Sequence, residues 1–390
     1  MKIVVVSDSF KGSLSSLEIC HLAEDVLRDQ FPSGEIRCIP VSDGGEGTVD
    51  ALARLPETIL HSVTTQDPLG RPVTAKYVQL NHNTCLIELA QASGLTLIPR
   101  ELRNPLATTT FGTGLLIRDA LSRGIRNIMV SIGGSATCDG GAGLLEALGV
   151  RFFDRDHHQL RMCGENLQKI VSADCSFLHP SLQKGEVAFD VLCDVENPLL
   201  GSSGAVMVYG PQKGADTAEK LSVLEQGMTN YAQVMEQVWE RGVRDLPGAG
   251  AAGGAGFALM GGLNAGMRSG IDAMLEFMHF TDELRNADLV ITGEGCLDNQ
   301  SCQGKVVAGV CKKCQAAGVP VISISGIIRS GYESLYKTGL WGAVSTVRSI
   351  MTLDDALNSA EELYRDALIR ISGLIKCGMK LSENARRKDI

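Results

Sequence analysis

The segment SIGGSATCDGGAG at residues 131–143 contains five glycines and one charged residue, Asp139. It follows RNIMVSI, which is typical of a buried strand, and precedes LLEALGV, which predicts a short helix. A glycine loop between a strand and a helix aims backbone amides at an anion, because glycine lets a ligand approach the main chain closely. The segment therefore predicts an α/β fold with a phosphate or carboxylate site. The alternative is a tight turn that packs helix against strand.

The two ends of the chain show strands alternating with helices, which predicts parallel pairing with right-handed crossovers. The middle of the chain is richer in glycine and less regular. We therefore expect a doubly wound terminal domain at 1–64 and 285–390, with a second α/β domain at 65–284 inserted into it. The expected terminal strands are KIVVVS (2–7), EIRCIPVS (35–42), DLVITG (288–293), PVISISG (320–326) and GAVSTV (342–347).

The bulk composition excludes several classes of protein. The 390 residues carry a formal net charge of -9, and no basic cluster is longer than the one at 386–388, which argues against a nucleic-acid binder. No apolar run is long enough to span a membrane, and MKIVVVSDSF predicts a first strand rather than a secretory signal. The 12 cysteines are scattered, as expected for reduced thiols in the cytoplasm.

Acidic residues accompany two further glycine loops. In VSDGGEGTVDAL (41–52), Asp43 and Glu46 flank the glycines, which indicates either a metal–phosphate site or an N-terminal capping box. In ITGEGCLDNQSCQGK (291–305), Glu294 and Asp298 follow a strand, where α/β sheets bind ligands, and Lys305 opens a helix. Carboxylates for Mg²⁺ and a lysine for phosphate are the parts of a phosphoryl-transfer site.

A lysine and two incomplete motifs narrow the choice. Lys11 in DSFKGSLSS (8–16) directly follows the first strand, where it would face an anion or lie on the surface beside a serine cap. GAGAAG (248–253) matches a dinucleotide motif by letter, but WERGVRDLP before it predicts helix and loop instead of the required strand. No P-loop motif occurs, because Val306 follows Gly304 and Lys305.

Together these stretches resemble the glycerate kinase type 1 family, the two-domain bacterial glycerate kinases. The resemblance covers most of the chain, and its departures include Cys296, where the family usually has arginine, Cys138, where it has asparagine, and Ser7 and Val307, where proline is common. The blocks that carry it occur in the family's order: DSFKGS, SDGGEGTVDAL, DPLGRPV, RNPLATTTFGTG, GGSATCDGGAG, CDVENPL, GPQKGA, GAGAAGG and TGEGCLDNQSCQGK.

The resemblance implies transfer of the ATP γ-phosphoryl group to D-glycerate with Mg²⁺, mainly to 2-phosphoglycerate. It also implies two α/β domains, one Rossmann-like, with the active site in the cleft between them. The alternatives are an ATP-dependent kinase of another small hydroxy acid and a non-catalytic metabolite-binding protein. We expect glycerate and ATP as small-molecule partners, no nucleic acid, no membrane, and a monomer or homodimer.

The candidate residues follow from these motifs. Lys11 and Lys305 would contact phosphoryl oxygens, Asp43 or Asp194 would accept the proton of the attacking hydroxyl, and Glu294 and Asp298 would hold Mg²⁺. Arg71 and Arg103 would bind the substrate carboxylate or form surface ion pairs. Ser135, Thr137 and Asp139 are further candidates for the substrate, and the glycines expected to bind nucleotide or phosphate are Gly44, Gly45, Gly47, Gly133, Gly134, Gly140, Gly141 and Gly304.

Overall fold

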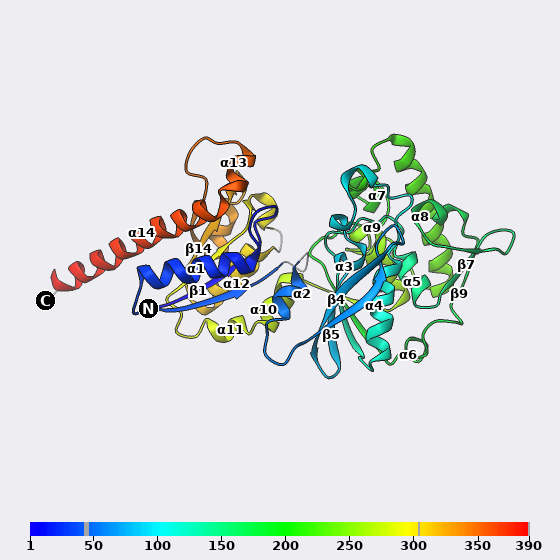
Figure 1. Cartoon of the computed structure of the whole chain (residues 1–390), viewed down its shortest axis with the longest axis horizontal. Coiled ribbons are helices and arrows are strands. Elements are labelled where there is room, and N and C mark those ends of the chain that lie inside the picture. Colours follow the sequence, from blue (N-terminus) through cyan, green and yellow to red (C-terminus); the bar gives the residue numbers. More distant parts are fainter. Residues whose placement is uncertain (43–46, 303–304, 389–390) are drawn as a thin grey trace. The chain divides into compact units, whose positions relative to one another are not determined.

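The computed structural model describes residues 1–42, 47–302 and 305–388. The chain forms two compact units: Met1–Asp43 with Ile271–Ile390, and Gly44–Gly270. Unit 1 is thus discontinuous in sequence, and unit 2 is inserted into it (Figure 1). Residues 59–64 lie in unit 2, because the strand Ile59–Gln66 pairs along its length with the strand Pro72–Asn81. The boundaries expected at 64/65 and 284/285 thus differ from those of the units, since residues 47–64 belong to unit 2 and residues 271–284 to unit 1.

Unit 1 is built on a parallel sheet of five strands. Its strand order, β16-β14-β12-β1-β2, is that of a doubly wound, Rossmann-like sheet. All four pairings are parallel, and they confirm the five terminal strands expected from the sequence. The strands are β1 (Lys2–Ser7), β2 (Glu35–Pro40), β12 (Leu289–Gly293), β14 (Val321–Ser325) and β16 (Leu340–Ser345).

Helices cover both faces of this sheet. Ile3 and Val5 of β1 pack against α1 (Ser16–Gln30) and α14 (Ala360–Lys388), whose C-terminal end runs on beyond the sheet (Figure 1). Val4 and Val6 point to the opposite face, because successive strand residues alternate, and both are fully buried. This explains the uninterrupted apolar run of β1. The remaining helices of this unit are α10 (Gly270–Phe277), α11 (Phe280–Glu283), α12 (Val306–Ala317) and α13 (Leu353–Asn358).

Unit 2 contains a mixed sheet of six strands in the order β11-β10-β6-β5-β4-β3. Four strands are parallel, and β3 and β4 add an antiparallel hairpin at one edge. The strands are β3 (Ile59–Gln66), β4 (Pro72–Asn81), β5 (Thr84–Glu88), β6 (Asn127–Ser131), β10 (Ala188–Leu192) and β11 (Gly266–Arg268); a second, antiparallel sheet contains β7 (Arg151–Phe153), β8 (Gln159–Leu160) and β9 (Ser172–Asp174).

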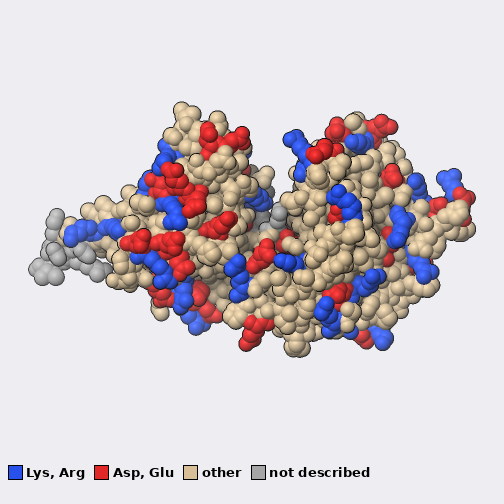
Figure 2. Space-filling model, in the orientation of Figure 1, with Lys and Arg blue, Asp and Glu red and all other residues tan. Residues whose placement is uncertain are grey.

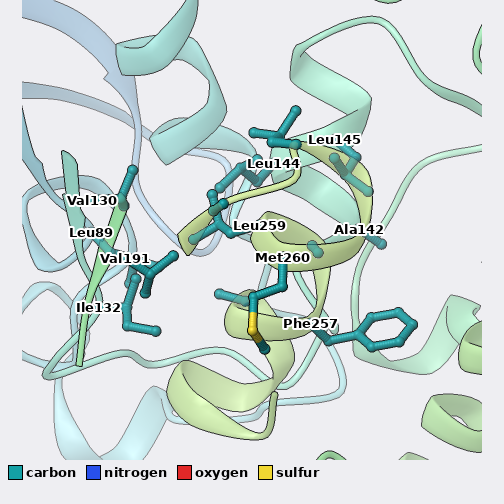
Figure 3. Close-up of a cluster of buried hydrophobic side chains, with 14 of the residues drawn as sticks. Leu89, Val130, Ile132, Ala142, Leu144, Leu145, Val191, Phe257, Leu259 and Met260 are labelled. Atoms are coloured by element: carbon teal, nitrogen blue, oxygen red, sulfur yellow. The ribbon is translucent and has the colours of Figure 1, made fainter. Parts of the chain in front are cut away.

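The core of unit 2 lies between its main sheet and the surrounding helices. Figure 3 shows Val130, Ile132 and Val191 on the sheet side, facing Leu144 of α5 (Ala142–Ala147) and Leu259 of α9 (Ala251–Gly262). The helices of this unit are α2 (Thr48–Leu52), α3 (Ala90–Ser93), α4 (Phe111–Ser122), α5 (Ala142–Ala147), α6 (Pro180–Gln183), α7 (Ala205–Tyr209), α8 (Ala218–Trp239) and α9 (Ala251–Gly262).

The surface agrees with the charge pattern of the sequence. Acidic and basic side chains are interspersed over the face seen in Figure 2, without a broad field of either sign. No helix within the described ranges is long and apolar enough to cross a membrane.

Candidate functional site

The carboxyl ends of three neighbouring strands in unit 1 carry most of the charged candidates. β1 and β12 end side by side, because Ser7 pairs with Gly293, and the Asp8 N–H donates to the Gly293 carbonyl at 2.9 Å. The next residue after β12 is Glu294, whose carbonyl accepts the N–H of Gly326, just past β14, at 3.1 Å. The loops after these strands therefore meet at one sheet edge, where α/β proteins bind ligands.

Lys11 lies at the tip of the first of these loops. A bridge between Phe10 and Leu14 closes the loop, Gly12 takes a φ of 85°, and Lys11 is exposed. A Cβ added to Gly295 would lie 3.4 Å from the backbone nitrogen of Lys11, so the loop after β12 lies directly against this turn. Lys11 and Glu294 thus belong to adjoining loops, and the Lys11 side chain remains open to solvent.

Asp298 and Lys305 are placed by the continuation of the loop after β12. The Asp298 Oδ1 accepts the N–H of Gln300 at 2.8 Å, and the Lys305 Nζ donates to the Gln300 Oε1 at 3.3 Å. Lys305 precedes the first turn of α12, a position at which helix amides and the ammonium reinforce each other toward an anion.

Cys296 lies between Glu294 and Asp298. Its Sγ is 3.7 Å from the Asp298 Oδ2. Burial raises the pKa of the Cys296 thiol, and the Asp298 carboxylate raises it further, so the thiol stays neutral near pH 7. Because a thiol has no cationic form, the side chain cannot supply the positive charge that arginine would bring to this position.

A buried carboxylate that the sequence analysis did not select also lies at this edge. Asp8 is 8% exposed and Glu294 is 6% exposed, and they follow neighbouring strands. Asp8 was visible in the DSF stretch, directly after a strand, which is the signal that should have marked it. Carboxylate oxygens are the ligands that Mg²⁺ prefers, but the described residues at this edge do not bring three such ligand atoms within 4.8 Å of one another.

The loop before α2 is described only in part. Asp43, Gly44, Gly45 and Glu46 lie outside the described residues, as does Gly304. The N–H groups of Gly47 and Val49 donate to the buried Glu88 carboxylate at 3.3 and 3.2 Å. Because these amides at the start of α2 already bind a carboxylate of the chain, Gly47 does not present its N–H to a phosphate.

The structure corrects the role expected for Asp139. Its side chain is fully buried and accepts four hydrogen bonds, from the Thr110 N–H (2.7 Å) and hydroxyl (2.8 Å) and from the N–H groups of Gly141 and Gly143 (both 3.2 Å). Burial raises the pKa of Asp139, while these hydrogen bonds oppose that rise. A side chain enclosed in this way fastens the glycine loop to the start of α4 and does not contact a substrate.

The second half of the glycine loop is also turned inward. The Gly140 N–H donates to the Gly253 carbonyl at 3.0 Å, and the Gly141 N–H is taken by Asp139. A Cβ would lie 2.6 Å from Tyr231 at Gly140 and 2.5 Å from Ala258 at Gly141. The expectation that these two amides cradle phosphate is therefore wrong, because close packing requires both glycines.

The first half of the same loop is accessible. Gly133 is half-buried, Gly134 is exposed with a φ of 69°, and the Gly134 carbonyl accepts the Leu95 N–H at 2.8 Å. Ser135 follows at 6% exposure, and Thr137 is fully buried. A ligand could therefore reach the loop at residues 133–135, whereas Thr137 is out of its reach.

Lys213, in the stretch GPQKGA, is a further candidate for the functional site, to which the sequence pattern alone assigns no role. It is only 3% exposed. Its Nζ donates to the Ser135 Oγ at 2.6 Å and to the Thr137 carbonyl at 2.8 Å. Burial lowers the pKa of Lys213, while Cys138 and Asp139 oppose that effect. A lysine among glycine and proline is a normal surface pattern, so only the fold reveals that this one is buried.

The two arginines differ in how fully they are engaged. The Arg71 Nε donates to the Asp67 carboxylate at 2.6 Å, and an Nη donates to the Leu97 carbonyl at 3.2 Å. The Arg103 Nε is buried and has no hydrogen-bond partner among the described residues. Arg71 thus forms the local ion pair that the sequence analysis held open, and Arg103 retains a free donor.

Arg103 lines a cavity of about 630 Å³ in unit 2. Three basic and two acidic side chains line it, Lys220 is paired with Asp216 at 2.8 Å, and no aromatic ring lines it among the described residues. The lining residues are Arg100, Glu101, Arg103, Pro211, Gln212, Gly214, Asp216 and Lys220. A polar cavity of this charge suits a small anion better than an adenine ring.

Asp194 and a surface cluster complete the set of acidic candidates. Asp194 follows β10, is half-buried, and accepts the Gly270 N–H at 3.0 Å through Oδ1.

Asp154, Asp156 and His158 lie close enough to share an ion. Asp154, however, accepts the N–H groups of the other two at 2.9 Å each, a pattern that is common in turns without an ion. These backbone hydrogen bonds account for the closeness of the three side chains without an ion.

Comparisons with known proteins agree along the whole chain. A model of the glycerate kinase family matches residues 3–376. A glycerate kinase from Bacillus subtilis is 42% identical, covering 96% of this chain and 98% of its own, and a glycerate 2-kinase from Escherichia coli is 40% identical, covering 97% and 99%. A crystal structure assigned to a glycerate kinase 2 from Salmonella typhimurium has a TM-score of 0.83 at 40% identity, covering 97% of this chain and 99% of that one. The chain belongs to the glycerate kinase family.

Proposed function

We propose that the protein transfers the γ-phosphoryl group of ATP to D-glycerate, with Mg²⁺, to give 2-phosphoglycerate. The observation that carries this proposal is near-complete coverage at about 40% identity by relatives that include an Escherichia coli glycerate 2-kinase. The edge of the unit 1 sheet supports it, because lysines and buried carboxylates gather where three parallel strands end.

In this proposal the unit 1 edge handles the phosphoryl group. Lys11 and Lys305 contact phosphoryl oxygens, and their charge favours the negative charge that spreads over the transferring group. Glu294 and Asp298, together with Asp8, hold Mg²⁺, which when bound neutralises charge on the phosphate oxygens. The half-exposed Gly133 and the exposed Gly134 are the glycines of the unit 2 loop that remain for an anion.

The substrate carboxylate is assigned to Arg103 rather than to Arg71. Arg103 has an unpartnered Nε and lines a polar cavity, whereas Arg71 is held by Asp67 and Leu97. A guanidinium binds a carboxylate through two parallel hydrogen bonds, so a free Nε matters for that geometry. Either Asp43 or Asp194 accepts the proton of the attacking hydroxyl.

The test is an assay of the purified protein with Mg-ATP and D-glycerate. ADP release is followed continuously, and the phosphorylated position is read by phosphorus NMR. We expect glycerate-dependent ADP release and a 2-phospho signal. If ADP is released only with another member of a panel of small hydroxy acids, that acid and not glycerate is the substrate. Nucleotide binding without turnover of any of these acids would indicate a metabolite-binding protein.

Arg103 can be tested in the same assay. Arg103→Gln should raise the KM for glycerate at least tenfold and leave the KM for ATP nearly unchanged, because it removes a carboxylate contact only. Arg151→Gln in the same unit is the matched control, since Arg151 stacks on Phe177 away from this cavity. An equal rise in both KM values would refute the assignment.

A further inference from the structure

We propose that Lys213 is a positioning residue whose buried ammonium fixes the Ser135 hydroxyl as a hydrogen-bond donor to an anionic oxygen of the reactants. This inference rests on the proposed kinase function and adds a residue pair to it. The anionic oxygen belongs either to the glycerate carboxylate or to an ATP phosphate, and the experiment below separates these two.

The position of Lys213 is fixed from both sides. It ends the short 3₁₀ turn Pro211–Lys213, and the following Gly214 has a φ of 105° and packs directly against the Arg103 carbonyl. A Cβ at Gly214 would lie 2.1 Å from the Arg103 carbonyl oxygen, so no residue with a side chain fits at this position. The turn therefore holds Lys213 facing the glycine loop, while its neighbours Gln212 and Gly214 line the polar cavity that Arg103 also lines.

The bonding of the ammonium dictates the role of Ser135. An ammonium has three donors and no acceptor, so the Ser135 Oγ must accept at 2.6 Å. The single hydroxyl hydrogen of Ser135 is then left to be donated elsewhere. The Thr137 carbonyl accepts a second Lys213 hydrogen at 2.8 Å, which fixes the direction of the ammonium.

The charge of Lys213 is not used up in an ion pair. In the described part of the chain the partners found for its Nζ are a hydroxyl and a carbonyl, and no ion pair of Lys213 is found there. Asp139, the nearest acid by its influence on Lys213, is committed to Thr110, Gly141 and Gly143. A buried charge with neutral partners is costly to fold, and such costs concentrate at functional sites.

The surroundings of Ser135 set where its hydrogen can go. Gly94 forms a bridge with Ser135, and the Ala136 N–H donates to the Ser93 carbonyl at 2.9 Å, so the backbone on this side is fixed. The residue before Ser135 is the exposed Gly134. A donor at this boundary, with a positive charge directly behind its oxygen, is a stronger partner for an anion than an ordinary serine.

The test is a double-substitution cycle on the full-length protein. Ser135→Ala and Lys213→Met should each lower kcat/KM by about 100-fold, as loss of one preorganised donor does. The double variant should have about the same kcat/KM as the less active single variant, because both changes remove the same oriented hydrogen. Lys184→Met, at an exposed lysine of the same unit, is the matched control and should keep normal kinetics.

A merely structural role for Lys213 would give a different pattern. It would lower the melting temperature of Lys213→Met while leaving kcat/KM of folded Ser135→Ala within about threefold of the unsubstituted protein, and that result would overturn the proposal. Losses that multiply in the double variant would also overturn it. Should Lys213→Met fail to fold, Ser135→Ala alone decides, since it removes the proposed donor and leaves Lys213 in place.

Titration calorimetry with D-glycerate and with ATP separates the two ligands. Weaker binding of glycerate alone by Ser135→Ala assigns the hydrogen to the carboxylate, and weaker binding of ATP alone assigns it to phosphate. Should the unsubstituted protein bind these ligands without turnover, the proposed function fails while this binding comparison still tests Ser135. Unchanged affinity for both ligands, together with unchanged turnover, rejects the inference.

Discussion

The loop after β1 in unit 1 and the loop after β6 in unit 2 both follow a buried parallel strand and both contain glycine with a positive φ, yet they use their polar groups differently. In unit 2, Asp139 and the Gly140 and Gly141 amides bond to the chain itself. In unit 1, Lys11 is exposed on the loop that adjoins Glu294. A glycine loop after a strand therefore indicates close packing as readily as ligand binding, and the hydrogen-bond partners decide between them.

The largest expected effect concerns Lys11. Lys11→Met should lower kcat about 10³-fold with little change in melting temperature, because an exposed lysine contributes charge to the transition state and little to the fold. Steady-state kinetics and thermal unfolding of the same preparation provide the measurement. Near-normal turnover would remove Lys11 from the phosphoryl site and weaken the contrast between the two loops.

Asp139 should show the opposite behaviour. Asp139→Asn replaces one acceptor oxygen by an NH₂ group that faces donors, so it should cost about 3 kcal/mol or more of the free energy of unfolding. Urea unfolding of the full chain measures this loss. Unchanged stability with abolished activity would return Asp139 to the list of ligand-binding residues.

A pair of glycine substitutions sharpens the comparison. Gly141→Ala places a Cβ 2.5 Å from Ala258 at a φ of 74°, and should cost about 2–3 kcal/mol through overpacking and backbone strain. Gly12→Ala has a similar φ, 85°, but no atom within 4 Å of the new Cβ, so only strain of about 1 kcal/mol is expected. Equal costs in denaturant titrations would show that strain, and not packing, sets the demand for glycine in both loops.

A further effect of small size is a pH dependence of stability in unit 2. Burial acts to raise the pKa of Glu236, but hydrogen bonds from the Arg244 side chain and from the N–H groups of Arg244 and Val243 outweigh it and lower the pKa below its ordinary value of 4.5. Ionised Glu236 therefore stabilises the fold above pH 4.5, and this contribution of about 1–2 kcal/mol is lost as the pH falls through the lowered pKa.

Unfolding of the unsubstituted protein and of Glu236→Gln measures this term. The stability difference between them should be largest at neutral pH and shrink toward pH 3. A difference that grows on acidification would contradict the sign of the Glu236 pKa shift.

The strands of unit 1 and the positions of its charged residues were accessible from sequence. KIVVVS and DLVITG are continuous apolar runs that only a sheet buried on both faces requires, and Lys11 and Glu294 follow them at once. Parallel pairing then places such residues at one edge, because the carboxyl ends of parallel strands coincide. Asp8 obeys the same rule, because it directly follows the first strand.

What only the tertiary structure decided is which polar groups face inward. Asp139, Lys213 and Arg71 look like ligand-binding or surface residues in the sequence, yet Asp139 and Lys213 are buried by contacts with Thr110 and Ser135, and Arg71 is held by Asp67. The local sequence determines strand, turn and helix, because these depend on neighbouring residues. Burial of a side chain depends on contacts with segments far along the chain. Lys213 and Ser135, for example, are 78 residues apart, and no local sequence pattern indicates that they meet.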